Sequence, residues 1–217
     1  MQNKLNYQKC LLQEIESIKS TNKKPKLLMH VCCGPCSTAC LGLVADYFDI
    51  TLLFYNPNIH PKFEYDKRYG ELLKFVNIKN SKGYNIKIVN AIYNEQEYFN
   101  KVKGLEKEKE GGKRCTECFN LRLEYSAEYA LENGFDYFTT TLTVSPHKNS
   151  QLINEIGNSL EKKYNIKYLF SDFKKNEGYK KSIELSREYN LYRQDYCGCI
   201  FSKLEREQQK LDKQKSV

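Results

Sequence analysis

The segment KLLMHVCCGPCS, residues 26–37, decides the fold of this 217-residue chain. Its first half, residues 26–31, is a short apolar run that predicts a buried β-strand. A Gly-Pro pair then breaks the pattern, and the sequence that follows predicts a helix over about 36–47. Cys32 and Cys33 come directly after the strand, at the end where parallel sheets form their binding sites. The segment therefore predicts a strand–turn–helix unit that presents thiols at its turn.

The rest of the chain repeats this alternation of short apolar strands and helices. Strands are predicted at about 27–31, 50–55, 86–89, 135–143 and 166–170. Helices are predicted at about 5–20, 36–47, 61–79, 95–102, 115–133, 145–164 and 177–189, with a polar helix past residue 200. This pattern predicts an α/β fold: a mostly parallel sheet with flanking helices and a metal site at the carboxyl ends of the strands.

Ser145 and Pro146 predict the start of one of these helices, because Ser suits the N-cap and Pro suits the first helical position. A helix N-terminus attracts anions, so this start is also a candidate anion site. No internal repeat or linker is visible, and we expect one domain over residues 1–217. Residues 1–25 are expected to hold an N-terminal helix, and residues 200–217 a polar C-terminal helix or tail.

The composition is typical of a soluble cytoplasmic protein. The first residues, MQNKLNYQKCLLQEI, lack the apolar core of a signal peptide, and no stretch approaches the roughly 18 apolar residues that span a bilayer. We therefore expect a cytoplasmic location and no membrane association. The formal net charge of +8 permits a nucleic-acid partner without establishing one. Thiols stay reduced in the cytoplasm, so the nine cysteines need an explanation other than disulfides.

Six of the cysteines form three clusters near the start, middle and end of the chain. Cys36 stands beside the first cluster, where a helix start favours thiolates over thiols. The second cluster has i, i+3 spacing on a predicted helix, so its thiols share one face, and a glycine in the third permits a sharp turn. The three clusters are Cys32-Cys33, Cys115 with Cys118, and Cys197 with Cys199.

The number of thiols favours two metal sites over one. A single tetrahedral zinc ion needs four ligands and would leave two or three thiols idle. A four-iron, four-sulfur cluster takes up to four thiolates, and the remaining thiols would bind a second metal ion. Cys10 and Cys40 fit better as small packing residues, and His30, inside the first strand, as a buried hydrogen-bonded residue beside the cluster.

Two other classes of protein also use clustered cysteines. A zinc-binding nucleic-acid module without catalysis would have compact CxxC knuckles, whereas these clusters lie far apart in an α/β pattern. An iron–sulfur or thiol electron carrier is suggested by the CCG run, but the chain lacks a repeated CCG motif. Both remain alternatives to an enzyme at this point.

Five long motifs resemble the QueH type of epoxyqueuosine reductase over residues 26–202, nearly the whole chain. They are HVCCGPCSTAC, YNPNIHPKFEYDKR, RCTECFNLRLEYSA, DYFTTTLTVSPHKN and FKKNEGYKKSIELSREYNLYRQDYCGCIFS. The resemblance implies the last step of queuosine synthesis, the removal of the epoxide oxygen from epoxyqueuosine in a tRNA anticodon. It also implies a nucleotide α-hydrolase (PP-loop-like) fold and a cobalamin-independent reaction.

The resemblance implies a [4Fe-4S] cluster beside a second metal ion, iron or zinc. By motif, the ligands of the two are Cys32, Cys33, Cys115, Cys118, Cys197 and Cys199. Some relatives carry an aspartate at the position of Cys36, which makes Cys36 a further candidate ligand of the second metal. Which thiol binds which metal stays open from the sequence.

The reaction needs two electrons and two protons, and it releases water. We expect the electrons to come from a ferredoxin or a flavodoxin, and we expect Asp195, Tyr196 or His147 to supply or relay protons. A mixture of cations and aromatic rings near the last cysteine cluster suits phosphates and splayed anticodon bases. The expected tRNA-binding residues are Lys174, Lys175, Tyr179, Lys180, Lys181 and Arg193.

Overall fold

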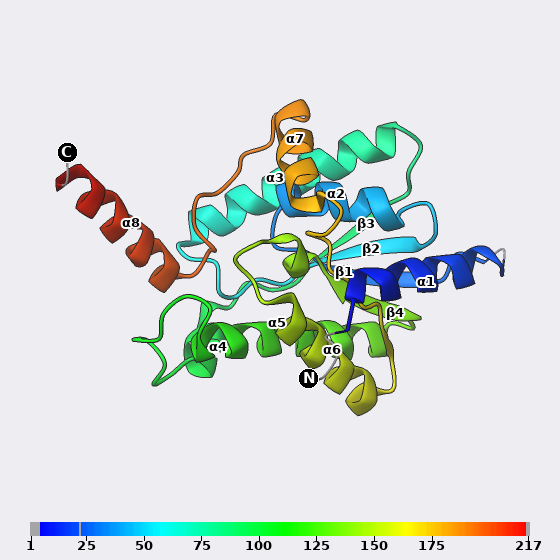
Figure 1. Ribbon diagram of the computed structural model, residues 1–217, viewed down its shortest axis with the longest axis horizontal. Helices are drawn as coiled ribbons and strands as arrows, with labels where there is room; N and C mark the ends of the chain where they lie inside the picture. Colours follow the sequence, from blue (N-terminus) through cyan, green and yellow to red (C-terminus); the bar gives the residue numbers. More distant parts are fainter. Residues whose placement is uncertain (1–4, 22, 216–217) are drawn as a thin grey trace.

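A computed structural model describes residues 5–21 and 23–215; residues 1–4, 22 and 216–217, which include the end of the expected C-terminal helix or tail, lie outside the described residues. Its centre is a five-stranded sheet in the order β3-β2-β1-β4-β5, and all four strand pairs are parallel (Figure 1). The strands are β1 (Lys26–His30), β2 (Asp49–Phe54), β3 (Lys87–Asn90), β4 (Tyr137–Thr140) and β5 (Lys167–Tyr168). The predicted α/β fold with a parallel sheet is confirmed.

Helices cover both faces of the sheet (Figure 1). Alternate residues of β1 point to opposite faces, so Leu27 and Met29 join one core and Leu28 the other. The first core also contains apolar residues of α1 (Tyr7–Lys19), α2 (Gly34–Val44) and α3 (Lys62–Ser81), and α7 (Gly178–Glu188) packs on α2. The second contains residues of α5 (Lys113–Glu132) and α6 (Ser150–Tyr164).

Strand β1 lies at the middle of the sheet, with β2 and β3 on one side and β4 and β5 on the other. After β3 the chain crosses to the other side of β1 to form β4, so the strand order reverses between β1 and β4. Such a switch point leaves a crevice beyond the strand ends. The turn from β1 to α2 carries the first cysteine cluster and lies at this place. Gly34 is needed there because a Cβ atom would lie 2.6 Å from the carbonyl oxygen of Glu71 in α3.

The helix predicted over about 145–164 is present, but its predicted start at Ser145-Pro146 is wrong. The chain turns as soon as β4 ends, because the Thr140 side chain accepts a hydrogen bond from the amide of Leu142 and opens a 3₁₀ turn, η1 (Thr141–Val144). Helix α6 begins at Ser150, where the Asn149 side chain caps the amide of Leu152. No helix start lies at Ser145-Pro146, so the expected anion site there is also wrong.

Two further elements complete the chain and frame the site. Helix α4 (Glu95–Lys101) precedes a loop over residues 102–112, and α8 (Ile200–Lys215) extends away from the sheet (Figure 1). The polar helix predicted past residue 200 is thus present. None of the helices in the described part of the chain is long and apolar enough to cross a bilayer.

Candidate metal centre

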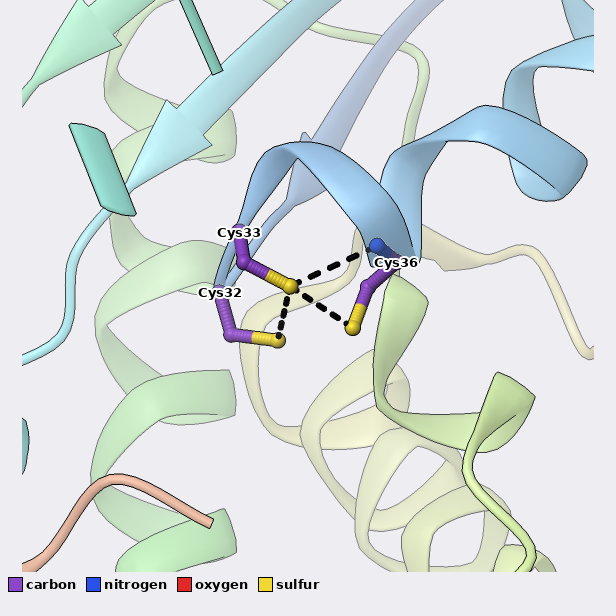
Figure 2. A group of neighbouring side chains, drawn as sticks. All are labelled: Cys32, Cys33 and Cys36. Carbon is purple, nitrogen blue, oxygen red and sulfur yellow. Dashed lines mark hydrogen bonds between the residues drawn. The ribbon is translucent and has the colours of Figure 1, made fainter. Parts of the chain in front are cut away.

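Cys32, Cys33 and Cys36 form one compact group of thiols at the β1–α2 turn. Figure 2 shows the three sulfur atoms turned toward one another, and all three lie within 4.8 Å of each other. The Sγ atom of Cys33 is 3.8 Å from that of Cys32 and 2.8 Å from that of Cys36. Cys33 is also the N-cap of α2, since its sulfur accepts the amide of Cys36 at 3.4 Å. Three thiols so close together fit the coordination of one metal ion.

A second group of four thiols comes from two distant segments. Cys115 and Cys118 lie on the first turns of α5, while Cys197 and Cys199 flank Gly198 in the loop before α8. Cys118 and Cys199 belong to the same buried cluster of side chains. Burial raises the pKa of Cys118 to about 12; Cys197, Cys199 and Cys115 add to the rise, and Arg122 opposes it. Cys118 therefore interacts electrostatically with the other three thiols of this group.

The loop that carries Cys197 and Cys199 is held by α3 and the segment before it. Arg68 in α3 donates to the carbonyl oxygens of Cys197 at 3.0 Å and Tyr196 at 3.3 Å, and pairs with Glu64 at 2.7 Å. The amide of His60 donates to the carbonyl oxygen of Gly198 at 2.8 Å. These contacts join residues about 130 positions apart and fix the backbone from which the last two thiols project.

Gly198 is required in this loop for two reasons. Its φ of +134° is a conformation that L-residues rarely adopt. A Cβ atom there would also lie 3.0 Å from Nη1 of Arg68. The sharp turn predicted for Cys197-Gly198-Cys199 is therefore present.

Three arginines are almost completely buried around the thiols: Arg68 and Arg114 are 1% exposed, and Arg122 is 2% exposed. Arg68 has Glu64 as its carboxylate partner, and Arg114 has Glu205 at 3.1 Å. Arg122 has no carboxylate partner among the described residues, and its Nη2 atom is buried without a hydrogen bond. Burial would lower the pKa of Arg122, but Cys118, Cys197, Cys32 and Cys115 outweigh it and raise that pKa.

A buried cation without an anion is costly, so this arrangement fits thiols that are held as thiolates. Thiolates of a metal centre supply such an anion permanently. The donor set and the orphaned guanidinium nitrogen both fit an anionic metal–thiolate centre. The sequence signal that points to Arg122 is its i+4 spacing from Cys118 on α5, a relation that analysis of the cysteines alone overlooks.

A cavity of about 1170 Å³ opens above the thiols. Its wall includes Cys32, Cys36, Cys197 and Lys148. Lys148 lies in the loop after η1, and although burial lowers its pKa, Cys197, Cys32 and Cys36 outweigh that effect and raise it. The sequence prediction singled out the neighbouring His147 and missed Lys148.

The three expected proton donors all line this cavity. Asp195 pairs with Lys210 at 2.5 Å, which lowers the pKa of its carboxyl group and keeps it ionised. The hydroxyl group of Tyr196 donates to the carbonyl oxygen of His60 at 3.0 Å, and burial is the largest cause that raises the pKa of Tyr196 to about 12. His147 is exposed on the loop between η1 and α6.

His30 is fully buried beneath the first thiol group, as expected. Its ring nitrogens contact the hydroxyl group of Thr140 at 2.9 Å and the carbonyl oxygen of Tyr55 at 3.0 Å. Burial is the largest cause that lowers the pKa of His30 to about 3, so the ring is neutral. A neutral His30 joins the ends of β1, β2 and β4 without adding charge near the thiols.

The expected tRNA-binding residues fall into three sets. Tyr179 and Arg193 line the cavity, with the guanidinium carbon of Arg193 5.8 Å from the centre of the Tyr179 ring. Lys174 is occupied elsewhere, since its ammonium group lies 3.0 Å from Asp172 and donates to Ser150. The exposed lysines of the set are Lys175, Lys180 and Lys181.

Comparison with known proteins decides the family. A sequence model of the family described as "Epoxyqueuosine reductase QueH" matches residues 27–205. The chain belongs to the QueH family. The epoxyqueuosine reductase QueH of Staphylococcus epidermidis is 50% identical over 202 residues, 92% of this chain and 85% of the relative. That of Thermotoga maritima is 38% identical over 183 residues, 83% of this chain and 91% of the relative.

The family match ends within α8, so the distal part of that helix lies outside the QueH pattern. Among solved structures, the U34-tRNA thiolase NcsA from Methanococcus maripaludis, with its [4Fe-4S] cluster, has a similar fold. Its TM-score is 0.50 at 15% identity, and the match covers 89% of this chain and 69% of that chain. At this identity the likeness concerns the fold, and it agrees with the PP-loop-like architecture expected from the sequence.

Proposed function

We propose that this chain reduces epoxyqueuosine to queuosine in a tRNA anticodon. The observation that carries the proposal is a compact group of three thiols with four further thiols that influence one another electrostatically, in a member of the QueH family whose cavity is lined by Cys32, Cys36 and Cys197. Neither group alone accounts for the thiol count. The reaction consumes two electrons and two protons, converts the epoxide to an alkene and releases one water molecule.

The four-thiol group, Cys115, Cys118, Cys197 and Cys199, is assigned to a [4Fe-4S] cluster, which takes four thiolates. The three-thiol group, Cys32, Cys33 and Cys36, is assigned to a second metal ion, iron or zinc, because its sulfurs lie close enough for one ion. When bound, the metal centre supplies single electrons and a Lewis acid for the epoxide oxygen. No corrinoid is part of the proposal.

We assign to Lys148 the role of stabilising the epoxide oxygen as it leaves. It lines the cavity beside Cys32, Cys36 and Cys197, and no carboxylate among the described residues pairs with it. A cation at this place stabilises negative charge that develops on the oxygen when its C–O bond weakens.

His147 and Tyr196 are assigned to proton delivery, because both line the cavity and both carry a transferable proton. His147 is exposed to solvent. Asp195 is assigned no proton transfer, since Lys210 holds it as a carboxylate.

We propose that the tRNA binds to the face that α7 forms beside the cavity. Tyr179 and Arg193 offer a ring and a planar cation for stacking on a splayed base. Lys175 and Lys181 offer exposed charges for phosphates, and Lys180 does so from an exposed ion pair with Glu177. Lys174 is left out because Asp172 already neutralises it. We propose that a ferredoxin or a flavodoxin supplies the electrons and that the reaction takes place in the cytoplasm.

The test is anaerobic reconstitution with iron and sulfide, followed by reaction with tRNA that contains epoxyqueuosine. Mass spectrometry of the nucleosides is expected to show queuosine, and the protein is expected to be brown, with absorbance at about 400 nm from an iron–sulfur cluster. A colourless protein that binds zinc and tRNA without turnover would instead favour the nucleic-acid module. A brown protein that exchanges electrons but leaves epoxyqueuosine unchanged would favour the electron carrier.

A further inference from the structure

Arg122 occupies the same face of α5 as two of the proposed cluster ligands. The spacing of Cys115, Cys118 and Arg122 is i, i+3 and i+7, which places all three along one side of the helix. The Nε atom of Arg122 donates to the carbonyl oxygen of Cys118 at 3.2 Å. The guanidinium group is thereby held inside the protein, one turn below the thiols.

The electrostatic neighbours of Arg122 come from both thiol groups. Cys118, Cys197 and Cys115 belong to the four-thiol group, and Cys32 belongs to the three-thiol group. The other titratable groups around it do not neutralise it: His30 is neutral, and Lys148 is a second cation. Arg122 thus interacts electrostatically with thiols of both groups.

The two other buried arginines show what such a side chain ordinarily needs. Glu64 neutralises Arg68, and Glu205 neutralises Arg114. Arg122 has no such carboxylate among the residues that the structure describes, and Nη2 has no acceptor. An uncompensated buried cation costs several kcal/mol, so an anion is required at this place.

We propose that Arg122 is the internal counter-cation of the metal centre and raises its reduction potential. This inference rests on the proposed function, since it needs the thiolates and their metals. Each electron that enters the centre adds one negative charge. A fixed positive charge in a low-dielectric interior stabilises that added charge and makes uptake easier. Arg122 is therefore a positioning residue, which tunes the centre without touching the substrate.

The test measures the midpoint potential of the reconstituted holoenzyme by anaerobic titration, monitored by electron paramagnetic resonance. Arg122→Met, which removes the charge, is expected to load iron and to shift the potential to a more negative value. Arg122→Lys keeps the charge and is expected to stay near the wild-type potential. Lys163→Met is the matched control, because Lys163 pairs with Glu124 on the exposed face of α6; it is expected to leave the potential unchanged.

Each outcome bears on the inference. An unchanged potential in Arg122→Met overturns it. If Arg122→Met takes up no iron while Arg122→Lys loads fully at the wild-type potential, the requirement for a cation is supported. If neither variant loads iron, the shape of arginine is needed and not its charge, and the inference is overturned. A wild-type protein that forms no iron–sulfur cluster at all would instead contradict the proposed function.

Discussion

The two thiol groups of this protein are built in opposite ways. The group at the β1–α2 turn comes from five consecutive positions, and its geometry follows from a strand end, a Gly-Pro pair and a helix N-cap. The second group brings α5 together with the loop before α8, and Arg68 and Arg114 hold that assembly through contacts across the fold. A local site depends on its own sequence, whereas a composite site depends on residues that bind no metal.

The largest effect is expected from loss of a ligand in the composite group. Cys118→Ser is expected to abolish the absorbance at about 400 nm, since a cluster needs all its thiolates. It is also expected to lower turnover of epoxyqueuosine-containing tRNA by more than about 100-fold. Absorbance and single-turnover assays measure both. Cys10→Ser, on α1 and outside both groups, is the control and should behave as wild type. A brown, active Cys118→Ser protein would contradict the assignment.

The next effect separates structural support from ligation. Arg68→Met leaves Glu64 buried without its partner and releases two carbonyl oxygens of the Cys197 loop, so we expect a loss of about 3–5 kcal/mol in the free energy of unfolding. Urea denaturation of the reconstituted protein measures it. In the double variant Glu64→Gln with Arg68→Met, no unpaired charge remains, and the loss should be smaller. Equal losses in the single and double variants would contradict a stabilising role for the Arg68–Glu64 ion pair.

Lys148 lines the cavity together with thiols of both groups, and its removal tests whether they act on one substrate. Lys148→Met is expected to lower kcat/KM for tRNA by about 100-fold, because one donor to a developing oxyanion is lost. The iron content and visible absorbance should stay at wild-type values. Steady-state kinetics and metal analysis together decide it. Loss of iron with loss of activity would assign Lys148 to the support of the centre instead.

The smallest effect concerns the proposed tRNA surface of α7 beside the cavity. The double variant Lys175→Ala with Lys181→Ala is expected to weaken tRNA binding several-fold and to reduce the salt dependence of log Kd by about 1–2 units. Binding titrations at several salt concentrations measure the slope. Lys163→Ala, which removes a surface cation from α6, is the control and should leave the slope unchanged. Identical slopes in both variants would remove α7 from the proposed interface.

The same contrast explains what could be predicted from the sequence. Strand β1, the α2 start and the sheet follow from local apolar patterns and turn residues, and they were predicted. The helix start at Ser145-Pro146 was wrong because Thr140 and Asn149 supply the caps that this region uses. Thr140, Ser145 and Asn149 are all residue types that can cap a helix, and only the packing of the folded chain decides which of them does so.

The site shows the same limit. The cysteines were found from their motifs, but Arg68, Arg122 and Lys148 were not. Each becomes informative through burial or through neighbours far away in the sequence, such as Cys197 for Arg68. Lys174 shows the opposite limit, since a lysine in a basic stretch is paired with Asp172 in the folded chain. Charge in a sequence does not reveal which cations are already neutralised.

The most direct test of the account is the metal content of wild-type and Cys36→Ser proteins after anaerobic reconstitution. Wild-type protein is expected to hold about four irons and four sulfides in the cluster and about one further metal ion per chain. Cys36→Ser is expected to keep the four irons and sulfides and to lose the further ion. A Cys36→Ser protein that loses the cluster, or a wild-type protein fully active with four irons and no further metal, would contradict the division into two metal sites.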